Sequence, residues 1–145
     1  MTKRPRRTLP HRRPDLNRPV TVFAAGCFNR VHPAHLRLLR QARSLGDQLV
    51  VVISNDAHNH KPNAVPSSKR KKWLEDAHVA DRVVVGSPHG FAETLRRERP
   101  DILILGYDQR LPDAETEREV SRLGITVVTM PWYPGKEDPR VSHCG

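Results

Sequence analysis

The stretch VTVFAAGCFNRVHPAHLRLLRQARSLGDQLVVVISN, residues 20–55, decides the fold. It begins with a short apolar run that ends at Gly26, a pattern typical of a buried strand. Leucine and alanine then recur at steps of three and four residues as far as Leu45, which indicates a helix that Gly46 stops. A second apolar run over residues 48–55 is rich in β-branched side chains, so the stretch predicts a strand, a helix and a strand.

The same alternation continues along the chain. We expect a loop at 56–66 and then, in order, a helix at 67–77, a strand at 82–86, a helix at 91–98, a strand at 101–107, a helix at 113–123 and a strand at 125–130. This pattern predicts an α/β fold, Rossmann-like and doubly wound, with a parallel five-stranded sheet and helices on both faces. Such sheets bind ligands at the carboxyl ends of their strands, here the loops after Gly26, Asn55, Gly86 and Tyr107.

Composition and charge favour one folded domain with a basic tail. The 145 residues are 37% hydrophobic, and no apolar run approaches the roughly 20 residues that cross a bilayer, so no membrane partner is expected. Residues 1–19 carry seven Lys or Arg against one acid, hence +6 of the net charge of +9. We expect this tail to be disordered and the folded domain to span 20–145; any attachment to nucleic acid would be through the tail only.

Cysteine and histidine usage favours neither a disulfide scaffold nor a metal centre. Cys27 and Cys144 are too few for such a scaffold, and the N-terminus lacks a secretory signal, so a reducing cytoplasm is the expected location. Cys27 is expected to be a small buried residue rather than a nucleophile. A zinc site would draw on Cys27 and on four histidines, His32, His35, His58 and His60, but these lack a compact four-ligand spacing, so no protein metal site is predicted.

The segment GCFNRVHPAH, residues 26–35, holds the densest group of candidate site residues. His32 and His35 are three residues apart, and Pro33 suits the first position of a helix, so both imidazoles are expected near one helix start. A helix start exposes backbone N–H groups and partial positive charge, which favours phosphate. Two histidines there can donate to a polyphosphate and stabilise charge on a departing pyrophosphate. The alternative is that they only cap and solvate the helix.

This segment resembles the signature of the cytidylyltransferase-like superfamily of nucleotidyltransferases, which reads G-x-F-D, two or three further residues, and H-x-G-H. The resemblance runs from about Val20 to Met130. Its further matches are LGDQLVVVISND (45–56), Lys61, Arg70 and RPDILILGYDQ (99–109). HPAH (32–35) with LILGYDQ (103–109) is similar to archaeal-type FAD synthases, and the general layout is similar to glycerol-phosphate cytidylyltransferases.

The chain departs from the family pattern at three places. Asn29 stands where the family has aspartate and keeps the size and hydrogen bonding without the negative charge. Ala34 stands where the family has glycine and adds a methyl group where nucleotide and backbone approach closely. After the last strand, relatives often carry a serine- and threonine-rich phosphate-binding motif and a helix, whereas this chain offers Arg140 and Ser142.

The resemblance implies nucleotidyl transfer without an enzyme nucleophile, in which a phosphate oxygen of the acceptor attacks the α-phosphorus in line. It implies that His32, His35 and Lys61 are catalytic, as ligands of the phosphates. It implies that the nucleotide is bound by Ala25, Gly26, Cys27, Phe28, Asn29, Gly106, Tyr107, Asp108 and Gln109. Arg70, Arg140 and Ser142 are implied ligands of a phosphate or of the acceptor. Mg²⁺ is expected to bind mainly to the triphosphate, because it takes few protein ligands.

Several alternatives stay open at this point. The favoured reaction transfers AMP from ATP to a phosphorylated acceptor such as FMN and releases pyrophosphate; a cytidylyltransferase using CTP and a heptose-phosphate adenylyltransferase are alternatives of the same fold. The alternative from another functional class is a catalytically impaired module that binds a nucleotide or nucleic acid. Lys61 could be an ordinary loop lysine, and Arg70 could belong to a solvated run at 69–72. A homodimer is the alternative to a monomer.

Overall fold

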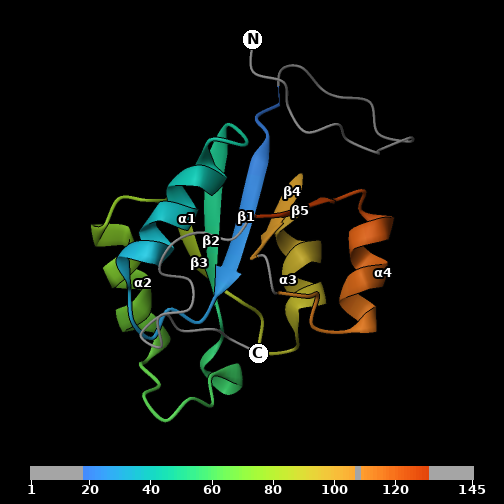
Figure 1. The fold of residues 1–145 in the computed structure, drawn as a ribbon. Coiled ribbons are helices and arrows are strands. Elements are labelled where there is room, and N and C mark those ends of the chain that lie inside the picture. The colour runs from blue at the N-terminus through green and yellow to red at the C-terminus, as the bar shows by residue number, and fades with distance from the viewer. Residues whose placement is uncertain (1–17, 107–108, 131–145) are drawn as a thin grey trace.

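The structure is a computed structural model, and it describes residues 18–106 and 109–130 (Figure 1). Its elements, in chain order, are β1 (Thr21–Gly26), α1 (Pro33–Arg43), β2 (Gln48–Ile53), η1 (Asp56–His58), α2 (Ser67–Asp76), β3 (Arg82–Val85), α3 (Phe91–Glu98), β4 (Ile102–Leu105), α4 (Ala114–Arg122) and β5 (Thr126–Thr129). The predicted alternation of strand and helix is confirmed. None of the helices in these two ranges is long and apolar enough to cross a membrane.

The sheet is parallel throughout, in the order β3-β2-β1-β4-β5. The chain moves outward from β1 to β3 on one side and then returns to build β4 and β5 on the other. The order therefore reverses between β1 and β4, where a doubly wound sheet leaves room for a ligand at the carboxyl ends of its strands. The predicted Rossmann-like fold is confirmed.

Helices cover both faces of the sheet, with α1 and α2 on one face and α3 and α4 on the other (Figure 1). Strand β2 shows how the sequence produces these layers. Leu49, Val51 and Ile53 pack on the α1–α2 side, while Val50 and Val52 pack on the α3–α4 side. Because successive side chains of a strand point to opposite faces, a strand buried on both faces needs a continuous apolar run.

A short 3₁₀ turn, η1, lies in the segment that the sequence predicts to be a plain loop. The Oδ1 atom of Asn55 accepts a hydrogen bond from the N–H of Ala57 at 3.0 Å and so caps the turn. A turn of three residues is too short to leave a helical repeat in the sequence, so periodicity does not predict it.

Carboxylates fix the amino-terminal edge of the sheet. Asp101, which precedes β4, accepts a hydrogen bond from the N–H of Thr21 at 2.9 Å. Asp81, which precedes β3, accepts one from the N–H of Leu49 at 2.7 Å. These bonds join the amino ends of neighbouring strands, so the loops at the opposite edge are the ones left for a binding site.

The Asp81 carboxylate should make folding sensitive to acid. Its pKa lies below the usual value, because the N–H of Leu49 and then the Arg43 guanidinium at 3.0 Å favour the charged form more than burial opposes it. A lowered pKa stabilises the folded state above the pKa of unfolded Asp, about 4, and that contribution is lost as the pH falls through the folded pKa. We expect Asp81→Asn to lower the free energy of unfolding, measured in urea, more at pH 7 than at pH 3.

Asp76→Asn is the matched control, because that carboxylate is 65% exposed in its pair with Lys72, and exposed pairs contribute little. It should change the free energy of unfolding only slightly. A deficit of Asp81→Asn that stays the same at both pH values would contradict the assignment.

Candidate functional site

The carboxyl edge of the sheet brings together segments that are far apart in the sequence. The loop after β1 (27–32) and the segment between β2 and α2 (54–66) start side by side, because Gly26 pairs with Ile53 at the ends of their strands. Strand β4 is paired to the other side of β1, so Gly106 follows it at the same edge. The predicted loops therefore share one end of the sheet.

His32 and His35 form a reciprocal cap at the start of α1. Nδ1 of His32 accepts a hydrogen bond from the N–H of Ala34 at 3.1 Å, and Nδ1 of His35 accepts one from the N–H of His32 at 3.0 Å. A ring nitrogen that accepts carries no proton, so each neutral ring has its proton on Nε2, as a donor suited to an anion. One nitrogen of each ring caps the helix. The capping interpretation is therefore chemically compatible with a phosphate role for the other ring nitrogen, Nε2.

Phe28 connects the end of β1 to His35. Its backbone has a φ of 54°, which is strained for a residue with a side chain, and its ring is buried. The ring stands edge-on to the imidazole of His35, with centroids 5.4 Å apart and planes at 70°. A Cβ atom at Gly26 would lie 2.8 Å from the Phe28 ring. The glycine is therefore required by this close approach, and the contacts from Gly26 through Phe28 help to place His35.

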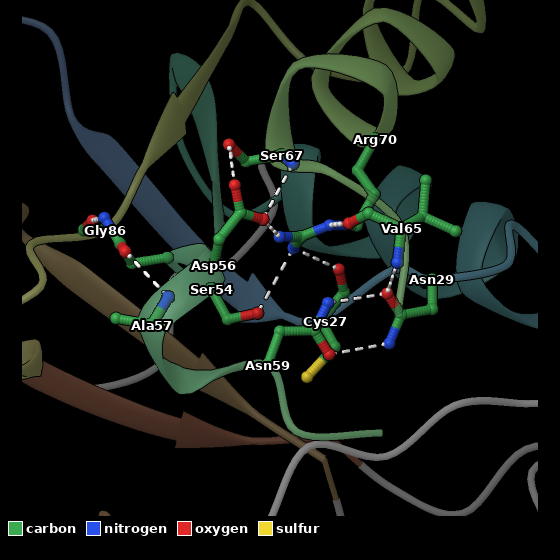
Figure 2. A network of polar contacts seen from close by, with 11 residues as sticks. Cys27, Asn29, Ser54, Asp56, Ala57, Asn59, Val65, Ser67, Arg70 and Gly86 are labelled. Atoms are coloured by element: carbon green, nitrogen blue, oxygen red, sulfur yellow. Dashed lines mark hydrogen bonds and ion pairs between the residues drawn. The ribbon is translucent and has the colours of Figure 1, made fainter. Parts of the chain in front are cut away.

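Asn29 is 4% exposed and forms a reciprocal amide pair with Asn59 (Figure 2). Its Nδ2 donates to Oδ1 of Asn59 at 2.8 Å, and its Oδ1 accepts from Nδ2 of Asn59 at 2.7 Å. The N–H of Val65 donates to the same Oδ1 at 3.0 Å. Because a backbone N–H can only donate, Val65 fixes which end of the Asn29 amide is oxygen, and so orients Asn59 as well. The structure thus gives the Asn29 side chain partners within the protein.

Arg70 is fully buried, which overturns the alternative that it lies on a solvated helix face. Its guanidinium donates to the backbone oxygens of Val65 (2.6 Å) and Cys27 (2.8 Å), to the Ser54 hydroxyl (3.2 Å) and to the Asp56 carboxylate (2.8 Å) (Figure 2). Burial acts to raise the pKa of Asp56, but hydrogen bonds, with that from Arg70 the largest, hold it below its usual value. In this arrangement Arg70 contacts the protein itself.

Gly106 and Gln109 are hydrogen-bonded to each other at the carboxyl end of β4. The N–H of Gly106 donates to Oε1 of Gln109 at 2.6 Å, and the N–H of Gln109 donates to the carbonyl of Gly106 at 3.1 Å. A Cβ atom at Gly106 would lie 3.1 Å from that same Oε1, so glycine suits this close approach of the Gln109 side chain. Tyr107 and Asp108, predicted to bind the nucleotide, lie outside the described residues, as do Arg140 and Ser142.

Comparison with known proteins identifies the family. Residues 23–143 match the family described as Cytidylyltransferase-like. The FAD synthase of Aciduliprofundum boonei is 40% identical over 112 residues, which cover 74% of this chain and 74% of that protein. The FAD synthase of Methanosarcina barkeri is 37% identical over 114 residues, which cover 76% of this chain and 82% of that protein. This chain belongs to the cytidylyltransferase-like family.

Solved structures agree with this assignment. A lipopolysaccharide core biosynthesis protein from Thermoplasma volcanium superposes with a TM-score of 0.69 at 32% identity, over 79% of this chain and 98% of that one. A pantoate-beta-alanine ligase from Francisella tularensis, at 14% identity and a TM-score of 0.53, shares the fold. The predicted resemblance is confirmed, and the protein is a nucleotidyltransferase of the cytidylyltransferase-like family.

The structure also places the remaining predicted residues of this nucleotidyltransferase. Ala25 is half-buried at the end of β1, and Cys27 is buried and is not a free thiol. Lys61 is half-buried in the loop before α2, and its carbonyl accepts a hydrogen bond from Ala64 at 3.0 Å. Ala34, which replaces the family's glycine, is fully buried and packs against Leu38. The added methyl group is therefore accommodated inside the first turn of α1.

Sequence reasoning missed Asn59 and the network around it. Asn59 lies in a polar loop with no periodic pattern, and its only sequence signal is its place shortly after the matched stretch 45–56. Within residues 18–106 and 109–130, no group of three or more His, Cys, Asp or Glu side chains is arranged to hold a metal ion. The carboxylate that takes part in the hydrogen-bond network of Arg70, that of Asp56, is bonded to Arg70 and to Ser67.

The tautomers of the two histidines can be measured directly. We expect long-range ¹H–¹⁵N correlation spectra at pH 8 to show Nε2 protonated and Nδ1 unprotonated in both His32 and His35, because each Nδ1 accepts a backbone hydrogen bond. Assignment by His→Gln variants identifies the signals. An Nδ1-protonated ring at either position would contradict this geometry.

A methyl group at Gly26 should disturb catalysis through Phe28. We expect Gly26→Ala to displace the buried Phe28 ring and with it His35, and to lower the rate of pyrophosphate release by about tenfold or more. Gly86→Ala is the matched control, because a Cβ atom there has its nearest neighbour at 3.4 Å, an ordinary contact. Equal rates for the two variants would show that Gly26 does not place the site.

Proposed function

We propose that this nucleotidyltransferase adenylylates FMN, forming FAD and pyrophosphate from ATP and FMN. The observation that carries the proposal is the pair of helix-start imidazoles whose Nδ1 atoms accept backbone hydrogen bonds, which assigns the proton of each neutral ring to Nε2. The choice of substrates is supported by the FAD synthases that are 37–40% identical over about three quarters of this chain.

In the proposed reaction, a phosphate oxygen of FMN forms a bond to the α-phosphorus of ATP. The bond between that phosphorus and the oxygen bridging to the β-phosphate breaks, and pyrophosphate leaves with the electron pair. Charge therefore grows on the leaving oxygens, where Nε2–H donors of His32 and His35 and the ammonium of Lys61 would stabilise it. No covalent intermediate with the protein is needed, so the contribution of the chain is to position and to stabilise charge.

Magnesium would enter with the nucleotide. Mg²⁺ keeps most of its water and takes few protein ligands, and the triphosphate supplies oxygens for it. The described residues fit this, because the Asp56 carboxylate of the polar network is bonded to Arg70 and Ser67. Magnesium would lower the charge of the triphosphate for the attack by FMN.

The nucleotide would lie across the ends of β1 and β4. The backbone from Ala25 to Phe28 would approach the nucleotide from one side, and the hydrogen-bonded pair of Gly106 and Gln109 would approach it from the other. Tyr107, Asp108, Arg140 and Ser142 stay predictions for the base, a phosphate or the acceptor. A homodimer, a cytoplasmic location and nucleic-acid binding by the tail at 1–19 likewise stay predictions.

Pyrophosphate release with a panel of substrates tests the proposal. We expect release with ATP and FMN in the presence of Mg²⁺, and His35→Ala should lower the turnover number by about 10²-fold, the usual effect of losing one donor that stabilises developing charge. His78→Asn is the control, because His78 is exposed at the end of α2 and its φ of 53° is one that asparagine tolerates.

Other outcomes identify the alternatives. Release with CTP and glycerol 3-phosphate, or with ATP and a heptose 1-phosphate, but not with FMN, would replace the substrates and keep the reaction class. No release with any pair at high enzyme concentration, with ATP still bound, would favour the impaired binding module.

A further inference from the structure

Asn29, Asn59 and Arg70 form a buried polar network, the loop clamp, between the loop after β1 and the segment between β2 and α2 (Figure 2). We propose that the loop clamp positions the catalytic groups of these two segments without touching substrate. The proposal rests on the proposed function for what those groups bind. It changes the role of Asn29 and Arg70 from ligands of the nucleotide or acceptor to positioning residues.

The amide pair joins the two segments at their middle. Asn29 lies three residues before His32, and Asn59 lies two residues before Lys61. Both side chains are buried, at 4% and 7% exposure, and each amide both donates to and accepts from the other. A buried amide that loses its partner suffers a desolvation penalty, so the two loops are held in the arrangement in which both amides are bonded.

Arg70 joins the same segments at their ends. Its guanidinium contacts the Cys27 carbonyl in the first loop and, in the second segment, Ser54 and Asp56 at the start and the Val65 carbonyl at the end. Val65 also donates its N–H to Asn29, so the two halves of the clamp meet at one residue. The rigid fork of a guanidinium can satisfy these acceptors only while the segments keep their relative positions.

The clamp is connected directly to the proposed phosphate ligands. Cys27 lies between Gly26 and Phe28, and Phe28 packs on the ring of His35. A shift of the first loop therefore moves His35, and a shift of the second moves Lys61. Misplacing a catalytic group by about 1 Å can lower a rate by about 10²-fold, so the clamp can act on catalysis without a substrate contact.

The two asparagines provide the sharpest test. If Asn29 acts only within the clamp, the variants Asn29→Ala, Asn59→Ala and the double variant should each lower turnover about tenfold or more, with the KM for ATP within about twofold of wild type. Asn29→Ala should be the slower of the two single variants, because it also leaves the N–H of Val65 without its acceptor. If Asn29 bound the nucleotide directly, Asn29→Ala would raise the KM for ATP far more than Asn59→Ala does, and the positioning role would be overturned.

Arg70→Lys tests the other half of the clamp. The lysine keeps the charge but has one compact ammonium, which cannot reach the four acceptors together. We expect turnover to fall about tenfold, and the backbone amides of residues 27–32 and 59–65 to exchange hydrogen faster, because both loops are loosened. Asn59→Ala should accelerate exchange in the same two segments.

Arg18→Lys is the matched control. Arg18 also pairs with an aspartate, at 2.6 Å from the buried Asp101, but at the opposite edge of the sheet. It should lower the free energy of unfolding without changing turnover or the exchange of residues 27–32 and 59–65. Faster exchange in Arg70→Lys with unchanged turnover would reduce the clamp to a structural feature and overturn the proposal, as would wild-type exchange in both Arg70→Lys and Asn59→Ala.

The exchange measurement needs no substrate, so the two proposals can fail separately. If wild type formed no FAD from ATP and FMN, the proposed function would fail. The clamp would then be judged with whichever nucleotide and acceptor the protein does use: lower turnover together with faster exchange would support it, and unchanged turnover would overturn it.

Discussion

Parallel pairing of β1 with both β2 and β4 is the constraint on which the rest of the structure depends. It places the ends of three strands at one edge, so loops from distant parts of the chain meet there. Parallel strands also need crossover helices, which bury β1 and β2 on both faces and explain why the opening stretch is so apolar. Polar groups at that edge are not covered by the sheet's own hydrogen bonds, and the chain supplies Asn29, Asn59 and Arg70 to satisfy them.

The sequence predicted what depends on local patterns. Apolar runs predicted the strands, a helical repeat predicted α1, and the spacing of His32 and His35 around Pro33 predicted their place at a helix start. It did not predict that Arg70 is buried, because a run of four basic residues usually lies in solvent. The burial is decided by acceptors distant in the chain, such as the Cys27 carbonyl 43 positions away, and no local pattern contains that information.

The replacement of the family's aspartate by Asn29 has a physical counterpart in Asn59. In two facing amides, each of the two N···O contacts contains one N–H proton, so both contacts are hydrogen bonds, as their lengths of 2.7 and 2.8 Å require. An ionised carboxylate at position 29 would face the Asn59 amide with one proton for two contacts. The amide at this position also adds no negative charge beside the proposed triphosphate site, where another anion would raise the electrostatic cost of binding. The substitution is therefore consistent with a working site.

The charge of Arg70 matters less than its burial. Its partner Asp56 is 57% exposed, so water screens the ion pair, and attraction alone gives the pair little stability. A guanidinium taken fully out of water is, however, strongly destabilising unless its N–H groups are bonded. The acceptors of these N–H groups lie on separate segments, and moving either segment would leave a buried donor without an acceptor. The cost of desolvating Arg70 therefore fixes the relative position of the two loops. A reaction that relies on the placement of its substrates, and not on an enzyme nucleophile, needs such fixed loops.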